Sequence, residues 1–102
     1  MKIILLCGAG LSTSLLAKKM GQEAQKQNKD IEVKAIAYSD ADGTLEDADL
    51  YLLGPQIEYY LDRLRMTVTD RPVAVIEMTV YGLMDGKKAL SFALGEIEKW
   101  KK

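Results

Sequence analysis

Histidine is absent from the 102 residues of this sequence, and its absence excludes whole classes of site chemistry. Without an imidazole the chain cannot supply Cys–His or Ser–His catalysis, or any other site that needs a histidine of its own. Cysteine occurs once, at position 7, which excludes an internal disulfide and fits a reducing compartment. We therefore expect a cytoplasmic protein.

The sequence also lacks an excess of charge of one sign and a long apolar run. Fourteen basic and fifteen acidic side chains give a net charge of -1, so no nucleic-acid partner is expected. The first apolar run, Ile3–Leu6, has four residues. A membrane span needs about 18 such residues and a signal peptide core about 7. At this length and with 48% hydrophobic residues, we expect one domain, residues 1–102.

Short apolar runs alternate with helical patterns along the chain. The runs predict strands at Ile3–Leu6, Ile31–Tyr38, Leu50–Leu53 and Val73–Ile76. Apolar spacing predicts long helices over residues 13–27 and 86–100 and another around Ile57, Tyr60, Leu61 and Leu64. We expect a turn at Ser39–Gly43, a short helix at Thr44–Ala48 and a loop at Thr79–Gly86. This alternation predicts an α/β three-layer sandwich with a four-stranded parallel sheet, order 2-1-3-4, and helices on both faces.

The predicted strand order locates a site before any motif is considered. Strands 1 and 3 flank the point where the strand order reverses, and ligands bind outside the carboxyl ends of such strands. Three segments meet there, namely Cys7–Ser14, Gly54–Gln56 and Thr79–Asp85. We therefore expect the functional residues in these segments.

Cys7 stands at the end of the first strand and directly before a glycine-rich turn into a helix. The unpaired N–H groups of a helix's first turn and the helix dipole favour a thiolate there, and can also bind an anion. Gly8 and Gly10 permit close approach of the backbone, and the hydroxyls of Ser12–Ser14 add donors. A cysteine often packs simply as a small hydrophobic residue, but this position favours a phosphoryl group carried on Cys7.

Other phosphate-binding devices fit the same segment less well. Gly10 is not followed by the lysine of a Walker A motif. A dinucleotide fingerprint would need glycine or alanine at Thr13, although Asp40 could serve as its ribose acceptor. A cysteine phosphatase loop would need arginine at position 13 to clamp the phosphate. A flavodoxin-like nucleotide-binding module and a small phosphatase remain the alternatives.

The residues of three segments together resemble the IIB component of bacterial sugar phosphotransferase systems (PTS), in the lactose/cellobiose/chitobiose (lichenan) family. The segments are Cys7–Leu16, Ala48–Ile57, and Tyr81-Gly82 with Asp85-Gly86. In this order they are much more specific than any one alone, and the resemblance covers almost the whole chain. This sequence differs from many members of the family at two positions: it has Gly8 where they have serine, and Leu11 where they have methionine.

The resemblance implies an enzyme component that works through a phosphocysteine, without metal or cofactor. Cys7 would accept a phosphoryl group from the phosphohistidine of a IIA partner and donate it to a sugar brought in by the membrane IIC partner. A β-linked disaccharide of cellobiose, chitobiose or lactose type is implied, and the sequence does not distinguish among these. The family's phosphate-binding residues correspond to Gly8, Ala9, Gly10, Leu11, Ser12, Thr13 and Tyr81.

An apolar rim around Cys7 is expected to dock these partners. Leu11, Leu15 and Met84 are the candidates, and contacts of this kind are small and transient. Tyr81 has a second interpretation, since an aromatic side chain in a loop often only covers the edge of a core. A monomer with transient partners is the simplest expectation for the assembly.

Overall fold

The computed structural model describes residues 1–8, 11–38 and 45–101, and for Leu11 and Ser12 it describes the backbone alone. Its strands are β1 (Lys2–Cys7), β2 (Glu32–Ala37), β3 (Leu50–Leu53) and β4 (Val73–Val75). Its helices are α1 (Leu11–Lys26), the 3₁₀ helix η2 (Pro55–Tyr60), α2 (Leu61–Thr67), α3 (Met78–Gly82) and α4 (Gly86–Lys101). None of these helices is long and apolar enough to cross a membrane.

The strands form one parallel sheet in the order β2-β1-β3-β4, which confirms the predicted order. The central strand β1 is paired on both sides: Leu6 lies opposite Ile36 on β2 and Leu53 on β3. Cys7 is the last residue of this ladder, opposite Ala37. The carboxyl ends of all four strands therefore lie at the same end of the sheet.

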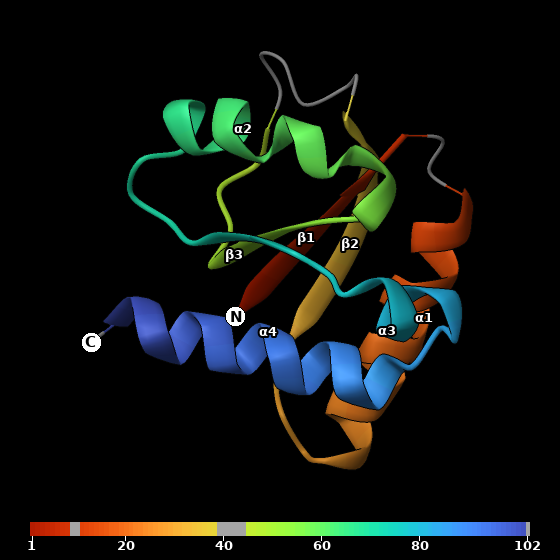
Figure 1. Cartoon of the computed structure of the whole chain (residues 1–102). Coiled ribbons are helices and arrows are strands. Elements are labelled where there is room, and N and C mark those ends of the chain that lie inside the picture. The colour runs from red at the N-terminus through yellow and green to blue at the C-terminus, as the bar shows by residue number, and fades with distance from the viewer. Residues whose placement is uncertain (9–10, 39–44, 102) are drawn as a thin grey trace.

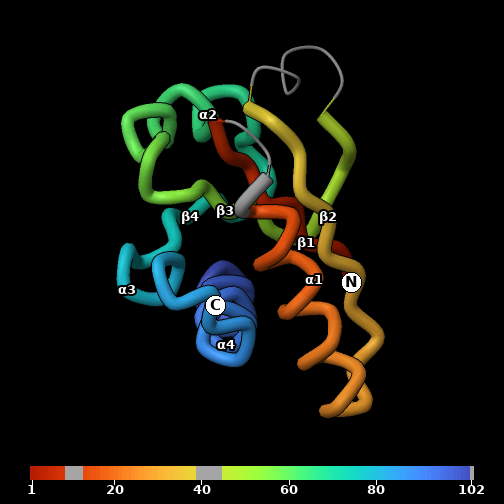
Figure 2. Tube along the Cα trace, turned by 90° about the vertical axis from the view of Figure 1, so that its right-hand side faces the viewer, coloured from red at the N-terminus to blue at the C-terminus, as the bar shows by residue number. Residues whose placement is uncertain are grey.

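Helices cover both faces of the sheet, as predicted, with a hydrophobic core beneath each layer. Figure 1 shows α4 on one side of the strands and α2 on the other, and the turned view of Figure 2 shows α1 beside α4. One core joins the α1 and α4 side chains to Ile3 and Leu5, and the other joins η2 and α2 to Ile4 and Leu6. These four β1 residues are fully buried, and each contributes about 1.5–3 kcal/mol by burial.

The short helix predicted at Thr44–Ala48 is wrong over the described residues 45–48, which form no regular element. The buried Tyr51 side chain explains the difference, because its hydroxyl accepts the Ala48 N–H (3.0 Å) and donates to the Glu46 carbonyl (2.6 Å). These bonds satisfy the backbone without a helical turn. The predicted Ser39–Gly43 turn and Thr44 lie outside the described residues.

The loop predicted at Thr79–Gly86 is also wrong in part, because α3 occupies Met78–Gly82. The Tyr81 N–H donates to the Glu77 carbonyl at 3.0 Å, and the Leu83 N–H donates to the Thr79 carbonyl at 3.1 Å. Threonine, valine and glycine are weak helix formers, so the local sequence does not predict this turn of helix. Burial of Tyr81 against the core stabilises it.

Candidate functional site

Cys7 lies at the carboxyl end of the central strand and is almost fully buried, with 3% of its surface exposed. The Thr13 hydroxyl donates a hydrogen bond to its sulfur, with 2.7 Å between Oγ1 and Sγ. Thr13 belongs to the first turn of α1 and has no exposed surface. The sulfur therefore lies beside the amino end of α1, as the sequence predicts.

The amino end of α1 gives this sulfur an electropositive neighbour. The first N–H groups of a helix have no partner within the helix, and the dipole adds positive charge there. α1 spans 16 residues and has no acidic side chain in its first turn that would compete for these groups. A negatively charged group attached to the sulfur is the kind of ligand that a helix amino end binds.

Gly54 brings the end of β3 and helix α3 close to the end of β1. Its N–H donates to the Leu6 carbonyl at 2.9 Å. A Cβ atom at position 54 would lie 3.0 Å from Gln56 Oε1, 3.5 Å from Tyr81 Cε2 and 3.6 Å from the Leu6 oxygen. The absence of a side chain at Gly54 therefore lets three segments meet one residue away from Cys7.

Tyr81 is 5% exposed and packs into the core beneath α1 and α4. Its ring edge faces Gly54, so it helps to form the wall beside the end of β1. Tyr81 therefore packs in the core, as one of its two interpretations expects, and its predicted part in phosphate binding stays a prediction.

The predicted phosphate-binding segment is described only in part. Gly8 is exposed, and a Cβ atom placed on it would meet Ile57 Cγ2 at 3.8 Å, an ordinary contact distance. Leu11 and Ser12 begin α1, and their side chains lie outside what the structure describes. Ala9 and Gly10 lie outside the described residues, as does Asp40 of the nucleotide-binding alternative.

The exposed apolar side chains differ from the predicted rim. Leu15 is 47% exposed, as a rim residue would be, but Met84 is half-buried and packs against the core. Its backbone turns in the left-handed region (φ 50°) directly after α3. Met78 (72% exposed) and Leu83 (76% exposed), on α3 and at its end, are the exposed residues that the sequence analysis missed. Leu83 lies in the stretch predicted as a loop, and Met78 directly precedes that stretch.

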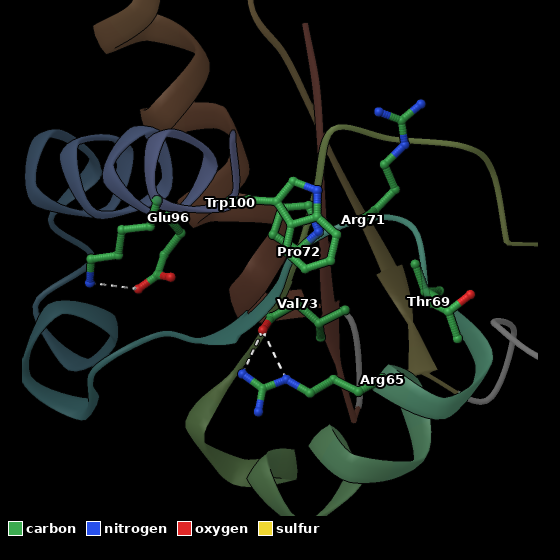
Figure 3. A pocket seen from close by; sticks show the side chains of 9 residues that line it. Arg65, Thr69, Arg71, Pro72, Val73, Glu96 and Trp100 are labelled. Carbon is green, nitrogen blue, oxygen red and sulfur yellow. Dashed lines mark hydrogen bonds and ion pairs between the residues drawn. The ribbon is translucent and has the colours of Figure 1, made fainter. Parts of the chain in front are cut away.

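A pocket of about 440 Å³ lies at the opposite end of the sheet, around the start of β4 and the end of α4. Among the residues that line it, Arg65 donates twice to the Val73 carbonyl, and Lys99 pairs with Glu96 at 3.7 Å. Figure 3 shows the Arg71 guanidinium pointing away from Arg65 and from Trp100. None of the predicted site residues lines this pocket.

Acidic, cysteine and histidine side chains do not gather in groups of three or more within the described part of the chain. Around Cys7 the structure describes a sulfur, the Thr13 hydroxyl and the first turn of a helix.

Comparison with known families decides which class of protein uses this arrangement. The model of the family described as PTS system, Lactose/Cellobiose specific IIB subunit matches residues 2–92. The chain belongs to this family. This membership confirms the resemblance found in the sequence and makes the chain a component of a sugar phosphotransferase system.

Three curated relatives from two genera are similar over about nine tenths of their length. The oligo-beta-mannoside-specific EIIB component of Bacillus subtilis (strain 168) is 39% identical over 91% of this chain and 92% of its own length. The galactose-specific EIIB component of Lactococcus lactis subsp. cremoris (strain MG1363) is 38% identical over 89% of this chain and 91% of its own. The cellobiose-specific EIIB component of Lactococcus lactis subsp. lactis (strain IL1403) gives the same three values.

Two solved structures share the fold. The lactose-specific IIB domain of Streptococcus pneumoniae has a TM-score of 0.84, with 20% identity over 94% of this chain and 96% of its own. The cellobiose-specific IIB protein of Borrelia burgdorferi has a TM-score of 0.77, with 32% identity over 97% of this chain and 93% of its own. These likenesses confirm the predicted fold class.

Proposed function

We propose that Cys7 carries the phosphoryl group of this PTS component. It accepts the group from a phosphohistidine of a IIA partner and donates it to a sugar brought by a membrane IIC partner. The observation that carries the proposal is the Cys7 sulfur at the end of β1, beside the first turn of α1 and hydrogen-bonded by Thr13 at 2.7 Å. A nucleophile next to a helix amino end is suited to bear a dianion.

The proposed cycle has two displacements at phosphorus. In the first, the sulfur attacks, a P–S bond forms and the P–N bond of the phosphohistidine breaks. The imidazole keeps that electron pair and takes up the proton that the thiol loses. In the second, a sugar hydroxyl attacks, a P–O bond forms and the P–S bond breaks. The electron pair returns to sulfur, which takes up the hydroxyl proton. Because the partner supplies the imidazole, a chain without histidine can take part.

The phosphoryl oxygens are proposed to bind the backbone N–H groups of residues Gly8–Thr13 and the Ser12 hydroxyl. In the sequence these residues precede α1 or belong to its first turn, where a helix favours negative charge. Tyr81 is proposed to close the β3 side of the site, because its ring packs against Gly54. Ala9, Gly10 and Leu11 are proposed to act through their backbone N–H groups alone.

The positions of the arginines favour a carrier over a phosphatase. The chain has arginine only at positions 63, 65 and 71. Arg63 lies 5.7 Å from the Tyr60 ring centroid, and Arg65 is bound to the Val73 carbonyl. Arg71 pairs with Asp47 at 3.4 Å. A phosphorylated Cys7 would therefore lack the guanidinium clamp that supports hydrolysis in cysteine phosphatases, which favours transfer to an acceptor.

Partner docking is proposed at the exposed apolar side chains near the carboxyl end of the sheet, Leu15, Met78 and Leu83. Such contacts suit brief encounters on the cytoplasmic side of the membrane. The sugar is proposed to be a β-linked disaccharide. The names of the relatives support a small sugar but include oligo-beta-mannoside, galactose and cellobiose, so they do not select one.

The test is the intact mass of the protein after incubation with phosphoenolpyruvate, the general transfer proteins and a IIA protein of this family. We expect wild type to gain one phosphoryl group and Cys7→Ser to gain none. Release of free phosphate should stay slow. A gain on Cys7→Ser, or no gain with several IIA proteins, would contradict the proposal.

The same preparation separates the carrier from a nucleotide-binding module. Such a module would bind a flavin or nucleotide with a spectral change that Cys7→Ser leaves intact. Steady release of phosphate from an aryl phosphate would instead indicate a phosphatase.

A further inference from the structure

We propose that the Thr13 hydroxyl acts on the Cys7 sulfur itself, stabilising it as the leaving group when the phosphoryl group is passed on. The inference rests on the proposed function and assigns Thr13 a role beyond its backbone N–H. It starts from one contact, the 2.7 Å hydrogen bond from Thr13 Oγ1 to Cys7 Sγ.

The hydroxyl is held in place by a rigid element rather than by the segment between Cys7 and α1. Thr13 has no exposed surface, and α1 is anchored one turn later by Leu16 and again by Met20, both fully buried. The sulfur is fixed in turn by the ladder of β1. The bond therefore joins a central strand to a core-packed helix, and its geometry does not depend on a partner being present.

The hydrogen bond lies in the interior of the protein. Thr13 has no exposed surface, and Cys7 exposes only 3% of its surface. A hydrogen bond in such surroundings is electrostatically stronger than one in water.

The chemistry of the second displacement needs such a donor. When the P–S bond breaks, the electron pair goes to sulfur and negative charge develops there. A hydrogen bond to a charged acceptor is stronger than one to a neutral acceptor, so the O–H group stabilises the departing thiolate more than the phosphocysteine. Loss of the hydroxyl should slow phosphoryl donation about 10- to 100-fold.

Acceptance of the phosphoryl group should depend less on the same hydroxyl. A donor on the sulfur increases the thiolate fraction but lowers the nucleophilicity of that thiolate, and the two effects oppose each other. Thr13 should therefore affect the two half-reactions unequally. A purely structural role would slow both alike.

Thr13→Val tests the assignment, since valine keeps the branched shape and loses the hydroxyl. Thr13→Ser keeps the hydroxyl, and Thr67→Val makes the same change on α2, where the Thr67 hydroxyl donates to the Arg63 carbonyl. Each variant is phosphorylated by the IIA protein, isolated, and mixed with unphosphorylated IIA to measure return of the group. The sulfur is the leaving group in this return, as it is in transfer to a sugar, so the return rate serves as the measure of donation. The rate in each direction is followed by intact mass. Unfolding curves show which variants are folded.

A second readout needs no partner. The thiolate of unphosphorylated Cys7 is measured by its ultraviolet absorbance across the neutral and mildly alkaline range. We expect Thr13→Val to show less thiolate at each pH and a donation rate about 10- to 100-fold lower, with acceptance changed less. Thr13→Ser and Thr67→Val should behave as wild type.

The outcomes separate this inference from the proposed function. Equal slowing of both directions in Thr13→Val, or slowed donation with an unchanged thiolate signal, would overturn the assignment of the hydroxyl to sulfur. A third outcome is a reduced thiolate signal in Thr13→Val while neither wild type nor any variant accepts a phosphoryl group. This result would support the contact between the hydroxyl and the sulfur and would overturn the carrier function. If Thr13→Val fails to fold, Thr13→Ser still decides, because loss of donation or of thiolate in that variant contradicts the inference.

Discussion

At the scale of single residues, Glu46 shows how one residue joins three strands. Its carboxylate pairs with Lys2 of β1 and Lys34 of β2, while its carbonyl accepts the hydroxyl of Tyr51 from β3. The hydrogen bond from Lys2, followed by that from Lys34, lowers the pKa of Glu46 from 4.5 to about 2. The folded state therefore holds this carboxyl ionised at a pH where the unfolded chain protonates it.

This lowered pKa predicts a pH-dependent stability. The contribution of Glu46 is present above pH 4.5 and is lost as the pH falls from there through about 2. We expect Glu46→Gln to be less stable than wild type at neutral pH and the two unfolding free energies to converge near pH 2. Denaturant unfolding from neutral pH to this value measures the difference. Because the ion pairs of Glu46 are exposed, added salt should reduce this difference in stability.

Glu98→Gln is the matched control, because Glu98 is an exposed glutamate on α4. The unfolding free energy of Glu98→Gln should stay close to that of wild type throughout this pH range. A gap between wild type and Glu46→Gln that stays constant on acidification would show that the ion pairs of Glu46 are not its source.

Single residues also show the limit of sequence reasoning about the site. The position of Cys7 could be predicted because a short apolar strand, a glycine-rich turn and hydroxyl residues follow one another directly. The hydroxyl that reaches the sulfur could not be chosen among three candidates. That choice depends on where the turn places the helix, and only the structure shows Thr13 Oγ1 at 2.7 Å.

At the scale of elements, the strands and long helices could be predicted because their apolar patterns agree with their burial. β3 begins and ends where the sequence predicts, at Leu50 and Leu53. The short elements could not be predicted, because tertiary contacts decide them. Tyr51 holds residues 46–48 out of a helix, and burial of Tyr81 stabilises α3 despite weak local propensity.

The contact between α1 and α4 gives a prediction at this scale. A Cβ atom on Gly86 would lie 2.7 Å from the Lys19 carbonyl carbon and 2.8 Å from its oxygen. This backbone cannot move without shifting α1. Gly86→Ala should therefore force the two helices apart and destabilise the protein by about 1–3 kcal/mol, measured by denaturant unfolding at neutral pH.

Gly95 offers the same substitution in the same helix with the opposite expectation. A Cβ atom there would meet nothing within 4 Å. Gly95→Ala should stabilise the protein by about 0.5–1 kcal/mol, because alanine favours the helix more than glycine does. Equal stability of the two variants would show that α4 does not press on α1 at Gly86.

At the scale of the whole molecule, the two ends of the sheet carry different groups. The amino ends of the strands are joined by charged side chains, among them Lys2 and Glu46. The carboxyl end holds Cys7, with Leu15, Met78 and Leu83 exposed on the helices that follow β1 and β4. Stabilising charge is therefore separated from the end where partners are proposed to dock.

This separation predicts that exposed apolar side chains contribute to IIA binding at the carboxyl end of the sheet and not at its amino end. Leu83→Asp, at the end of α3, should raise the concentration of IIA that gives half-maximal phosphorylation by about tenfold, since it puts a charge into a small apolar contact. Met66→Asp is the control. Met66 is 80% exposed but lies on α2 just before Val68 and Thr69, which line the pocket at the opposite end.

The measurement is the initial rate of mass gain at several IIA concentrations. At saturating IIA the Leu83→Asp rate should return close to that of wild type, because the substitution leaves Cys7 and Thr13 in place. Met66→Asp should follow the wild-type curve throughout. If both variants weaken binding equally, the partner does not distinguish the two ends and the docking proposal fails. If only the saturated rate falls in Leu83→Asp, α3 acts on the chemistry at Cys7 rather than on docking.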